Sequence, residues 1–185
     1  MNLKQYITLY KRVFDSACCQ QIIDRSNQSK HTKHTWYNPY REVESLSDDL
    51  EPLISYPKYP SYIDDYIRDK MKDYTEIHKD NRFSIDAHTP LRINKYEKGN
   101  IMDKHVDHIQ SIFDGKNKGV PILSFIIGLN DNYKGGEVVF FTGWNEKKYR
   151  VEKGDMLIFP SCFLYPHRVE SIKSGIRYSA VGWGF

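Results

Sequence analysis

From Leu91 to Phe185, short apolar or alternating runs are separated by Gly, Asn, Asp and Pro. Runs of this length between turn residues are typical of β-strands. Two of the turns carry glycine, in KGG at 134–136 and KGD at 153–155, where glycine can take positive φ without steric cost. The pattern predicts about eight short strands, near residues 91–96, 101–106, 121–129, 136–141, 147–151, 155–159, 166–170 and 176–183.

Strands in this number fit a double-sheet jelly roll of the cupin type, a double-stranded β-helix. Closing two sheets on each other also removes most of the exposed strand edges that would otherwise promote aggregation. The first half of the sequence instead predicts helices and loops. One helix is expected over about 16–26, capped by Asp15 or Ser16, and a second over 61–78, capped by Ser61. We therefore expect a mainly β fold with flanking N-terminal helices (α+β).

The length fits one globular domain over residues 1–185. Residues 1–90 would form a helical and loop support, and residues 91–185 the jelly-roll core. Between the two expected helices, the stretch 36–62 is rich in Tyr and Pro, and its prolines exclude a long regular element. This stretch could line a substrate groove or pack over the sheet, and the sequence does not decide between these two roles.

Composition excludes several function classes. The formal charge is +3 with the basic residues dispersed, which argues against a dedicated nucleic-acid binder. No segment reaches the roughly 20 apolar residues needed to span a bilayer, and the first ten residues lack a signal-peptide core. The three cysteines have neither metal-site spacing nor a disulfide pattern. We expect a cytoplasmic protein with reduced thiols and no membrane partner.

Four residues in the second half carry the chemistry. His105 lies in the predicted strand 101–106 and Asp107 directly follows it, and on a strand two residues two positions apart point to the same face. His167 follows Pro166 at the start of a later strand, where an antiparallel neighbour can bring it beside the first pair. Two imidazoles and one carboxylate make the facial triad that binds non-heme Fe(II) and leaves positions open for co-substrate and dioxygen.

The fourth residue, Arg177, lies on the last predicted strand, where Ser179, Val181 and Trp183 share its parity. A guanidinium in a mostly apolar barrel requires an anion to offset its desolvation. Its planar fork suits a carboxylate held by two parallel N–H bonds. The far carboxylate of 2-oxoglutarate is the natural candidate.

The segment from Leu91 to Phe185 resembles the 2-oxoglutarate- and Fe(II)-dependent oxygenases, in their prolyl 4-hydroxylase-like branch. HxD alone is a weak signal, but the ordered set of HxD, GGE, KGD, PHxV and GxRY ending in Trp is specific. The matching segments are RINKY at 92–96, KHVDH at 104–108, LSFIIGLN at 123–130, GGEVVF at 135–140, KGDMLIF at 153–159, PHRV at 166–169 and GIRYSAVGW at 175–183.

The resemblance implies that His105, Asp107 and His167 bind iron and that Arg177 binds the distal carboxylate of 2-oxoglutarate. Tyr96 stands where the family often has a tyrosine near the co-substrate. The chain departs from the family before the Leu-Asn turn, where Ile127 and Gly128 replace a frequent tyrosine, so part of the co-substrate contact stays open. The implied cofactors are Fe(II) and 2-oxoglutarate, with ascorbate left open.

Other residues near the motif have plainer interpretations. His108 has the wrong parity to join His105, so a solvent or loop position is expected, and Asp103 should sit at a strand edge. Trp183 is expected in the core or the pocket wall, and the loop 109–119 could act as a lid. Surface or capping roles are expected for the histidines outside the pattern, which are His31, His34, His78 and His88.

The expected function is hydroxylation of a C–H bond, with dioxygen and 2-oxoglutarate consumed, on a prolyl residue of a peptide or protein. The alternatives are a free amino acid or small-metabolite hydroxylase and, in a different class, a non-catalytic jelly-roll binding module. A nucleic-acid demethylase of the superfamily usually carries a second Arg where this chain has Trp183. A halogenase would lack the carboxylate of Asp107.

Overall fold

The structure is a computed structural model that describes residues 2–38, 43–45, 50–79, 83–107, 113–114, 118–142 and 146–185. Its first half contains a 3-10 turn, Leu3–Tyr6, two helices, α1 (Ser16–Asn27) and α2 (Tyr62–Ile77), and five short strands. These strands are β1 (Thr8–Tyr10), β2 (Thr32–Lys33), β3 (Trp36–Asn38), β4 (Val43–Ser45) and β5 (Leu53–Ser55).

The second half is built from strands. All eight that the sequence predicts are present: β6 (Arg92–Tyr96), β7 (Met102–His105), β10 (Leu123–Gly128), β12 (Val138–Phe140), β13 (Lys147–Tyr149), β14 (Met156–Pro160), β15 (His167–Val169) and β17 (Arg177–Gly184). Four further short strands were not predicted: β8 (Phe113–Asp114), β9 (Lys118–Gly119), β11 (Tyr133–Gly135) and β16 (Ile172–Gly175).

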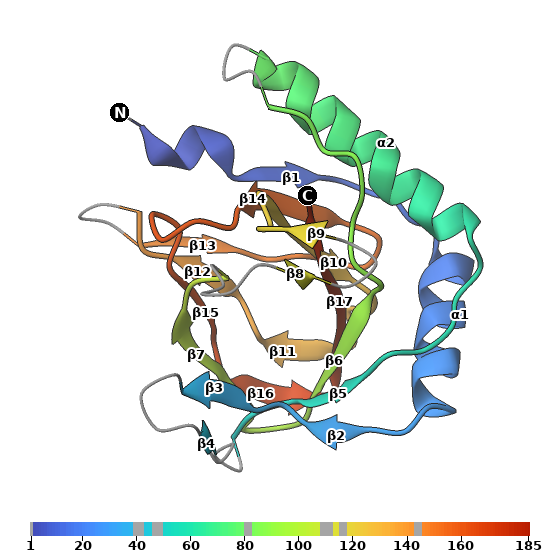
Figure 1. The fold of residues 1–185 in the computed structure, drawn as a ribbon. Helices are drawn as coiled ribbons and strands as arrows, with labels where there is room; N and C mark the ends of the chain where they lie inside the picture. Colours follow the sequence, from blue (N-terminus) through green and yellow to red (C-terminus); the bar gives the residue numbers. More distant parts are fainter. Residues whose placement is uncertain are drawn as a thin grey trace.

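Two sheets face each other and enclose the centre of the molecule (Figure 1). The larger sheet has the strand order β1-β14-β10-β17-β6-β5-β2, and the smaller one β13-β12-β15-β7. Every pairing within these two sheets is antiparallel. The predicted mainly β fold with two N-terminal helices is therefore confirmed.

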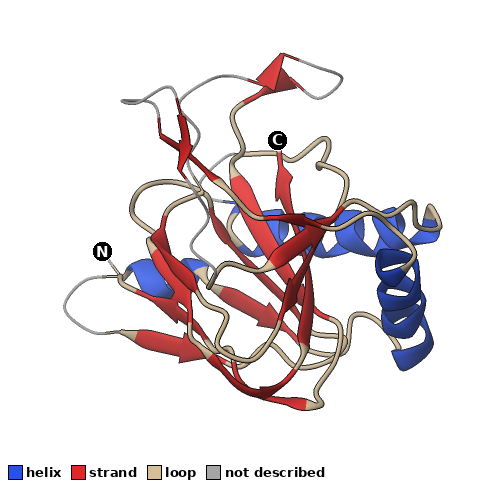
Figure 2. Cartoon of the chain, turned by 90° about the horizontal axis from the view of Figure 1, so that it is seen from below, coloured by secondary structure: helices blue, strands red, loops and turns tan. Residues whose placement is uncertain are grey.

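The larger sheet has a hydrophobic core on each face, and successive side chains of the central strand β17 point alternately into one and the other. Tyr178 and Ala180 face the helices, whereas Val181 faces the smaller sheet. The helices cover the outer face of the larger sheet (Figure 2). Helix α2 buries the apolar row that its sequence predicts, Ile63, Ile67, Met71 and Tyr74. Each such side chain contributes roughly 1.5–3 kcal/mol when it leaves water.

The two helix starts differ. The side chain of Asp15 accepts a hydrogen bond from the backbone N–H of Cys18 at 2.7 Å, so the predicted cap of α1 is confirmed. The prediction that Ser61 caps α2 is wrong for its side chain, which makes no cap hydrogen bond. Ser61 has φ −62° and ψ −26°, already helical, whereas a capping side chain needs extended backbone.

Parts of two predictions lie outside the described residues. Of the expected lid loop 109–119, the structure describes 113–114 and 118–119, which pair as β8 and β9. In the Tyr- and Pro-rich stretch 36–62, the described elements are short, as expected. Among the residues described, no helix is both long and apolar enough to cross a membrane.

Candidate metal and co-substrate site

Strand pairing brings the two predicted histidines together. His105 ends β7 and His167 begins β15, and the two are direct partners in the antiparallel register. Their ring centroids lie 4.3 Å apart. Asp107 follows two residues after β7 ends, so the predicted strand 101–106 stops one residue early. One potential ligand atom from each of the three residues lies within 4.8 Å of the others.

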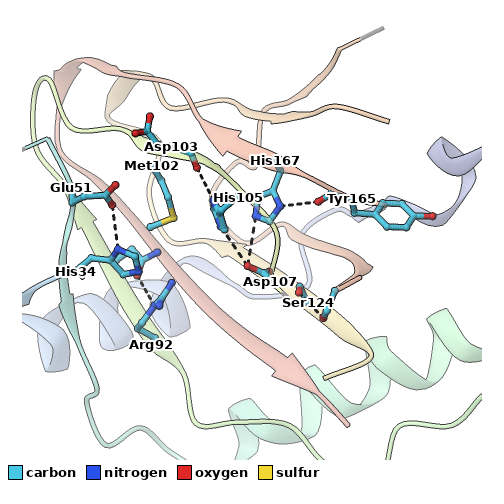
Figure 3. Close-up of polar contacts among 12 residues, drawn as sticks. His34, Glu51, Arg92, Met102, Asp103, His105, Asp107, Ser124, Tyr165 and His167 are labelled. Carbon is cyan, nitrogen blue, oxygen red and sulfur yellow. Dashed lines mark hydrogen bonds and ion pairs between the residues drawn. The ribbon is translucent and has the colours of Figure 1, made fainter. Parts of the chain in front are cut away.

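Backbone carbonyls orient both imidazoles (Figure 3). Nδ1 of His105 lies 2.7 Å from the carbonyl oxygen of Asp103, and Nδ1 of His167 lies 3.1 Å from that of Tyr165. A carbonyl can only accept, so each Nδ1 acts as the donor, and Nε2 is the ring nitrogen on the side of Asp107. The two Nε2 atoms face Asp107 Oδ1 at 3.4 Å and 4.0 Å.

The pKa shifts of Asp107 and His167 favour the protonation states that bind a cation. Burial would raise the pKa of Asp107, but the His167 and His105 imidazoles, with the Ser124 hydroxyl, outweigh it and hold that pKa below its usual range. Burial lowers the pKa of His167 to about 4. A carboxylate and a neutral imidazole are the protonation states that metal ligands need.

The donor set fits the implied ion. Two imidazole nitrogens and one carboxylate oxygen converge from one side, as in the facial triad of non-heme iron sites. Aromatic rings fix His167, with Phe140 stacked on it at 5.3 Å and Phe159 edge-on at 4.9 Å. His105, Asp107 and His167 are thus the residues that would hold Fe(II).

Arg177 and Tyr96 lie opposite each other on β17 and β6. Arg177 is 1% exposed, its Nη1 donates to Ser179 Oγ at 3.0 Å, and its Cζ lies 4.9 Å from the centre of the Tyr96 ring. Within the described part of the chain it forms no ion pair. A buried guanidinium without a carboxylate partner fits an anionic ligand, as the sequence predicts.

The triad residues His105, Asp107 and His167 line the same cavity as Arg177, between the two sheets. Parity along β17 is as predicted, since Ser179, Val181 and Trp183 all face this cavity with Arg177. The described residues that line it are Arg92, Asn94, Tyr96, Met102, His105, Asp107, Phe125, Ile126, His167, Val169, Arg177, Ser179, Val181, Gly182 and Trp183.

The sequence prediction missed Arg92 and Asn94. Both share the parity of Tyr96 on a predicted strand, and this signal could have placed them in the cavity. At the position of the missing family tyrosine, a Cβ on Gly128 would lie 2.2 Å from the Glu152 carbonyl oxygen. The backbone therefore leaves no room for a side chain there.

The histidines outside the pattern were expected to have surface or capping roles, and the structure shows that two of them are buried. A surface role for His34 is wrong, because it is 5% exposed and its Nδ1 lies 3.2 Å from Glu51 Oε2. Its burial depends on Glu51, which is distant in sequence. The side chain of His88 is also buried, at 5% exposure, beside Asp64. Asp103 contributes its carbonyl to His105, and His108 lies outside the described residues.

Comparison with known proteins places this site in a family. The sequence model of the 2OG-Fe(II) oxygenase superfamily matches residues 91–185. A PKHD-type hydroxylase of Rippkaea orientalis is 38% identical over 95 residues, and one of Thermosynechococcus vestitus is 35% identical over 96 residues. These matches cover 50% and 51% of this chain but 41% and 42% of the relatives, so the chain spans about two fifths of their length.

Solved structures share the fold over nearly the whole chain. A prolyl hydroxylase from Trichoplax adhaerens, in complex with a hypoxia inducible factor peptide fragment, superposes with a TM-score of 0.73 at 15% identity, covering 97% of this chain and 83% of that one. A Pseudomonas putida prolyl-4-hydroxylase gives 0.66 at 16% identity, covering 97% and 91%. This likeness confirms the jelly-roll architecture. Because the superfamily model matches half of the sequence, this chain belongs to the 2OG-Fe(II) oxygenase superfamily.

Proposed function

We propose that the chain is an Fe(II)- and 2-oxoglutarate-dependent dioxygenase that hydroxylates a C–H bond of a prolyl residue in a peptide or protein. The observation that carries this proposal is the shared cavity, whose wall holds the His105, Asp107 and His167 cluster together with Arg177, a guanidinium that has no carboxylate partner among the described residues. A metal triad alone fits several reactions. A metal triad with a buried cation fits a metal-binding co-substrate that carries a second carboxylate.

In this proposal the two histidines and Asp107 hold the ion, which supplies oxygen activation when bound. Arg177 binds the distal carboxylate of 2-oxoglutarate and fixes its orientation, while Tyr96 and Ser179 keep the guanidinium in place. The overall reaction converts 2-oxoglutarate, dioxygen and the substrate C–H bond into succinate, carbon dioxide and an alcohol.

We further propose that residues 1–185 act as one domain, with residues 1–90 as support for the core. Strand β1 pairs with β14, β5 pairs with β6, and both helices bury their apolar sides against the larger sheet. The names of the relatives and fold neighbours, which are prolyl or PKHD-type hydroxylases, support a prolyl substrate.

The test is an assay of the purified chain with Fe(II), ascorbate, 2-oxoglutarate and a library of proline-containing peptides. We expect succinate, together with peptides that are heavier by one oxygen atom in mass spectrometry. His105→Ala should abolish both products, and His31→Ala, a histidine outside the cavity, should retain them. Full turnover by His105→Ala would refute the assignment, and a wild-type chain that binds peptide without forming succinate would favour a non-catalytic binding module.

A further inference from the structure

A second cation stands at the other end of the cavity. Arg92 begins β6 and pairs with Val181 of β17, whereas Arg177 pairs with Tyr96 at the end of β6. At about 3.3 Å per strand residue, the two arginines lie on the order of 13 Å apart along the strands. Both line the cavity that contains the His105, Asp107 and His167 cluster.

The side chain of Arg92 is held by its neighbours. Its Nε donates to Asn94 Oδ1 at 3.1 Å, and its Cζ lies 5.2 Å from the centre of the Trp183 ring. Asn94 is itself 1% exposed and donates from Nδ2 to the Tyr96 hydroxyl at 3.4 Å. One edge and one face of the guanidinium are thus occupied. No residue described in the structure accepts from its two terminal nitrogens.

The nearby acids are engaged elsewhere. Oε2 of Glu51 lies 3.2 Å from Nδ1 of His34 (Figure 3), and Asp107 faces the two ligand imidazoles. Among the described residues, the cavity wall carries two guanidinium groups and one carboxylate. A divalent metal ion and doubly charged 2-oxoglutarate cancel each other, so one positive charge remains once both are bound.

We propose that Arg92 binds a carboxylate of the substrate and thereby makes the enzyme selective for acidic substrates. The inference rests on the proposed function and deepens it. The edge formed by the two terminal nitrogens of Arg92 fits a carboxylate through two parallel hydrogen bonds. Two sources offer this group next to a prolyl ring: an acidic side chain in a peptide, and the free carboxylate of a C-terminal proline.

The test compares matched substrates and variants. The first pair of peptides contains proline beside Glu or beside Gln, with blocked ends. The second pair ends in proline as a free acid or as an amide. Binding to the metal-loaded chain is measured by calorimetry without oxygen, so that affinity is obtained independently of turnover. Hydroxylation and the Kd for 2-oxoglutarate are measured alongside.

We expect the wild type to prefer at least one carboxylate peptide over its neutral partner, and the preferred pair identifies the source. Arg92→Gln should weaken binding of that peptide roughly 10- to 100-fold, as for loss of hydrogen bonds to a charged group. It should leave the neutral partner and the Kd for 2-oxoglutarate unchanged. Lys95→Gln is the matched control, because it removes one positive charge from the same strand. Lys95 pairs with Glu97 and lies outside the cavity, so its variant should keep the affinity for both peptides and for 2-oxoglutarate.

Three results would overturn the proposal. They are a wild type that does not discriminate within either pair, an Arg92→Gln variant that loses affinity for acidic and neutral peptides equally, and a variant whose defect lies in 2-oxoglutarate binding. Failure of the proposed function gives a different result, because the wild type would then form no succinate with any substrate.

Discussion

Gly136 lies against the side chain of Arg177, and the space it leaves allows the guanidinium to reach the cavity. Gly136 has φ +73°, and a Cβ there would lie 2.8 Å from Arg177 Cδ and 2.7 Å from Ile172 Cδ1. Gly136→Ala should therefore displace Arg177 and weaken 2-oxoglutarate binding by on the order of 10-fold, as for one charge-assisted hydrogen bond. Calorimetric titration of 2-oxoglutarate into the metal-loaded variant measures this.

Gly99 provides the matched control. Its φ is +91°, but a Cβ there meets nothing within 4 Å. Gly99→Ala should lose roughly 1–2 kcal/mol of stability from the left-handed backbone alone and keep its affinity for 2-oxoglutarate. Equal affinity losses in the two variants would show that backbone strain, rather than contact with Arg177, causes the effect.

The thiols differ in their environment. Cys19 is fully buried in α1, and burial raises its pKa to about 12. Because the thiolate is the reactive form, Cys19 should resist alkylation in the native protein at pH 8. Cys162 is partly exposed and should react first. Iodoacetamide labelling with peptide mass spectrometry tests this order, and rapid native labelling of Cys19 would contradict it.

At this scale the sequence predicted the residues whose neighbours are set by strand parity. His105, His167, Arg177 and Tyr96 lie on strands and line the cavity, and Asp107, which follows β7, lines it as the HxD motif indicates. The burial of His34 was not predictable, because it depends on tertiary contact with Glu51 rather than on local pattern. The same holds for the contact between Arg92 and Trp183, which joins two strands distant in sequence.

Among the elements, the two helices begin with different chemistry. Asp15→Ala removes a 2.7 Å hydrogen bond to the Cys18 amide and should lower the free energy of unfolding by about 1 kcal/mol. Ser61→Ala removes no cap bond and should stay within about 0.5 kcal/mol of wild type. Urea unfolding of both variants measures the difference, and an equal loss in the two would refute the assignment of caps.

Strands that lie within an alternating or apolar run were predictable from sequence, even the three-residue β12 and β13, whereas β1 and β11 were not. β1 is three residues long and exists because it pairs with Met156–Ile158 at the edge of the larger sheet. β11 contains Lys134-Gly135, which has the composition of a turn, yet it pairs with β16 through an irregular register. These elements are determined by their partners, and local sequence carries little signal for them.

Over the whole molecule, the proposed site joins the two sheets. The histidines lie on β7 and β15 of the smaller sheet, and Arg177 lies on β17 of the larger one. A ligand that contacts both should stabilise the fold as a unit, by about 2.7 kcal/mol at 100 times its Kd. We expect the Tm of the chain to rise when Mn(II) is added as the metal, and to rise again when 2-oxoglutarate is added.

Variants separate the two steps of stabilisation. Arg177→Gln should retain the rise with Mn(II) and lose most of the second rise, whereas His167→Ala should lose both. Differential scanning calorimetry provides the measurement. A second rise of normal size in Arg177→Gln would show that 2-oxoglutarate does not use this cation.

An anaerobic titration of the chain with Fe(II) and 2-oxoglutarate, followed by visible absorption, tests the iron site and its co-substrate together. If His105, Asp107 and His167 hold the iron beside Arg177, a metal-to-ligand charge-transfer band should grow and saturate at one iron per chain. The band should be absent in His167→Ala and Asp107→Ala, and should require more 2-oxoglutarate in Arg177→Gln. A band of full intensity in His167→Ala, or none in the wild type, would show that these residues do not form the proposed iron site.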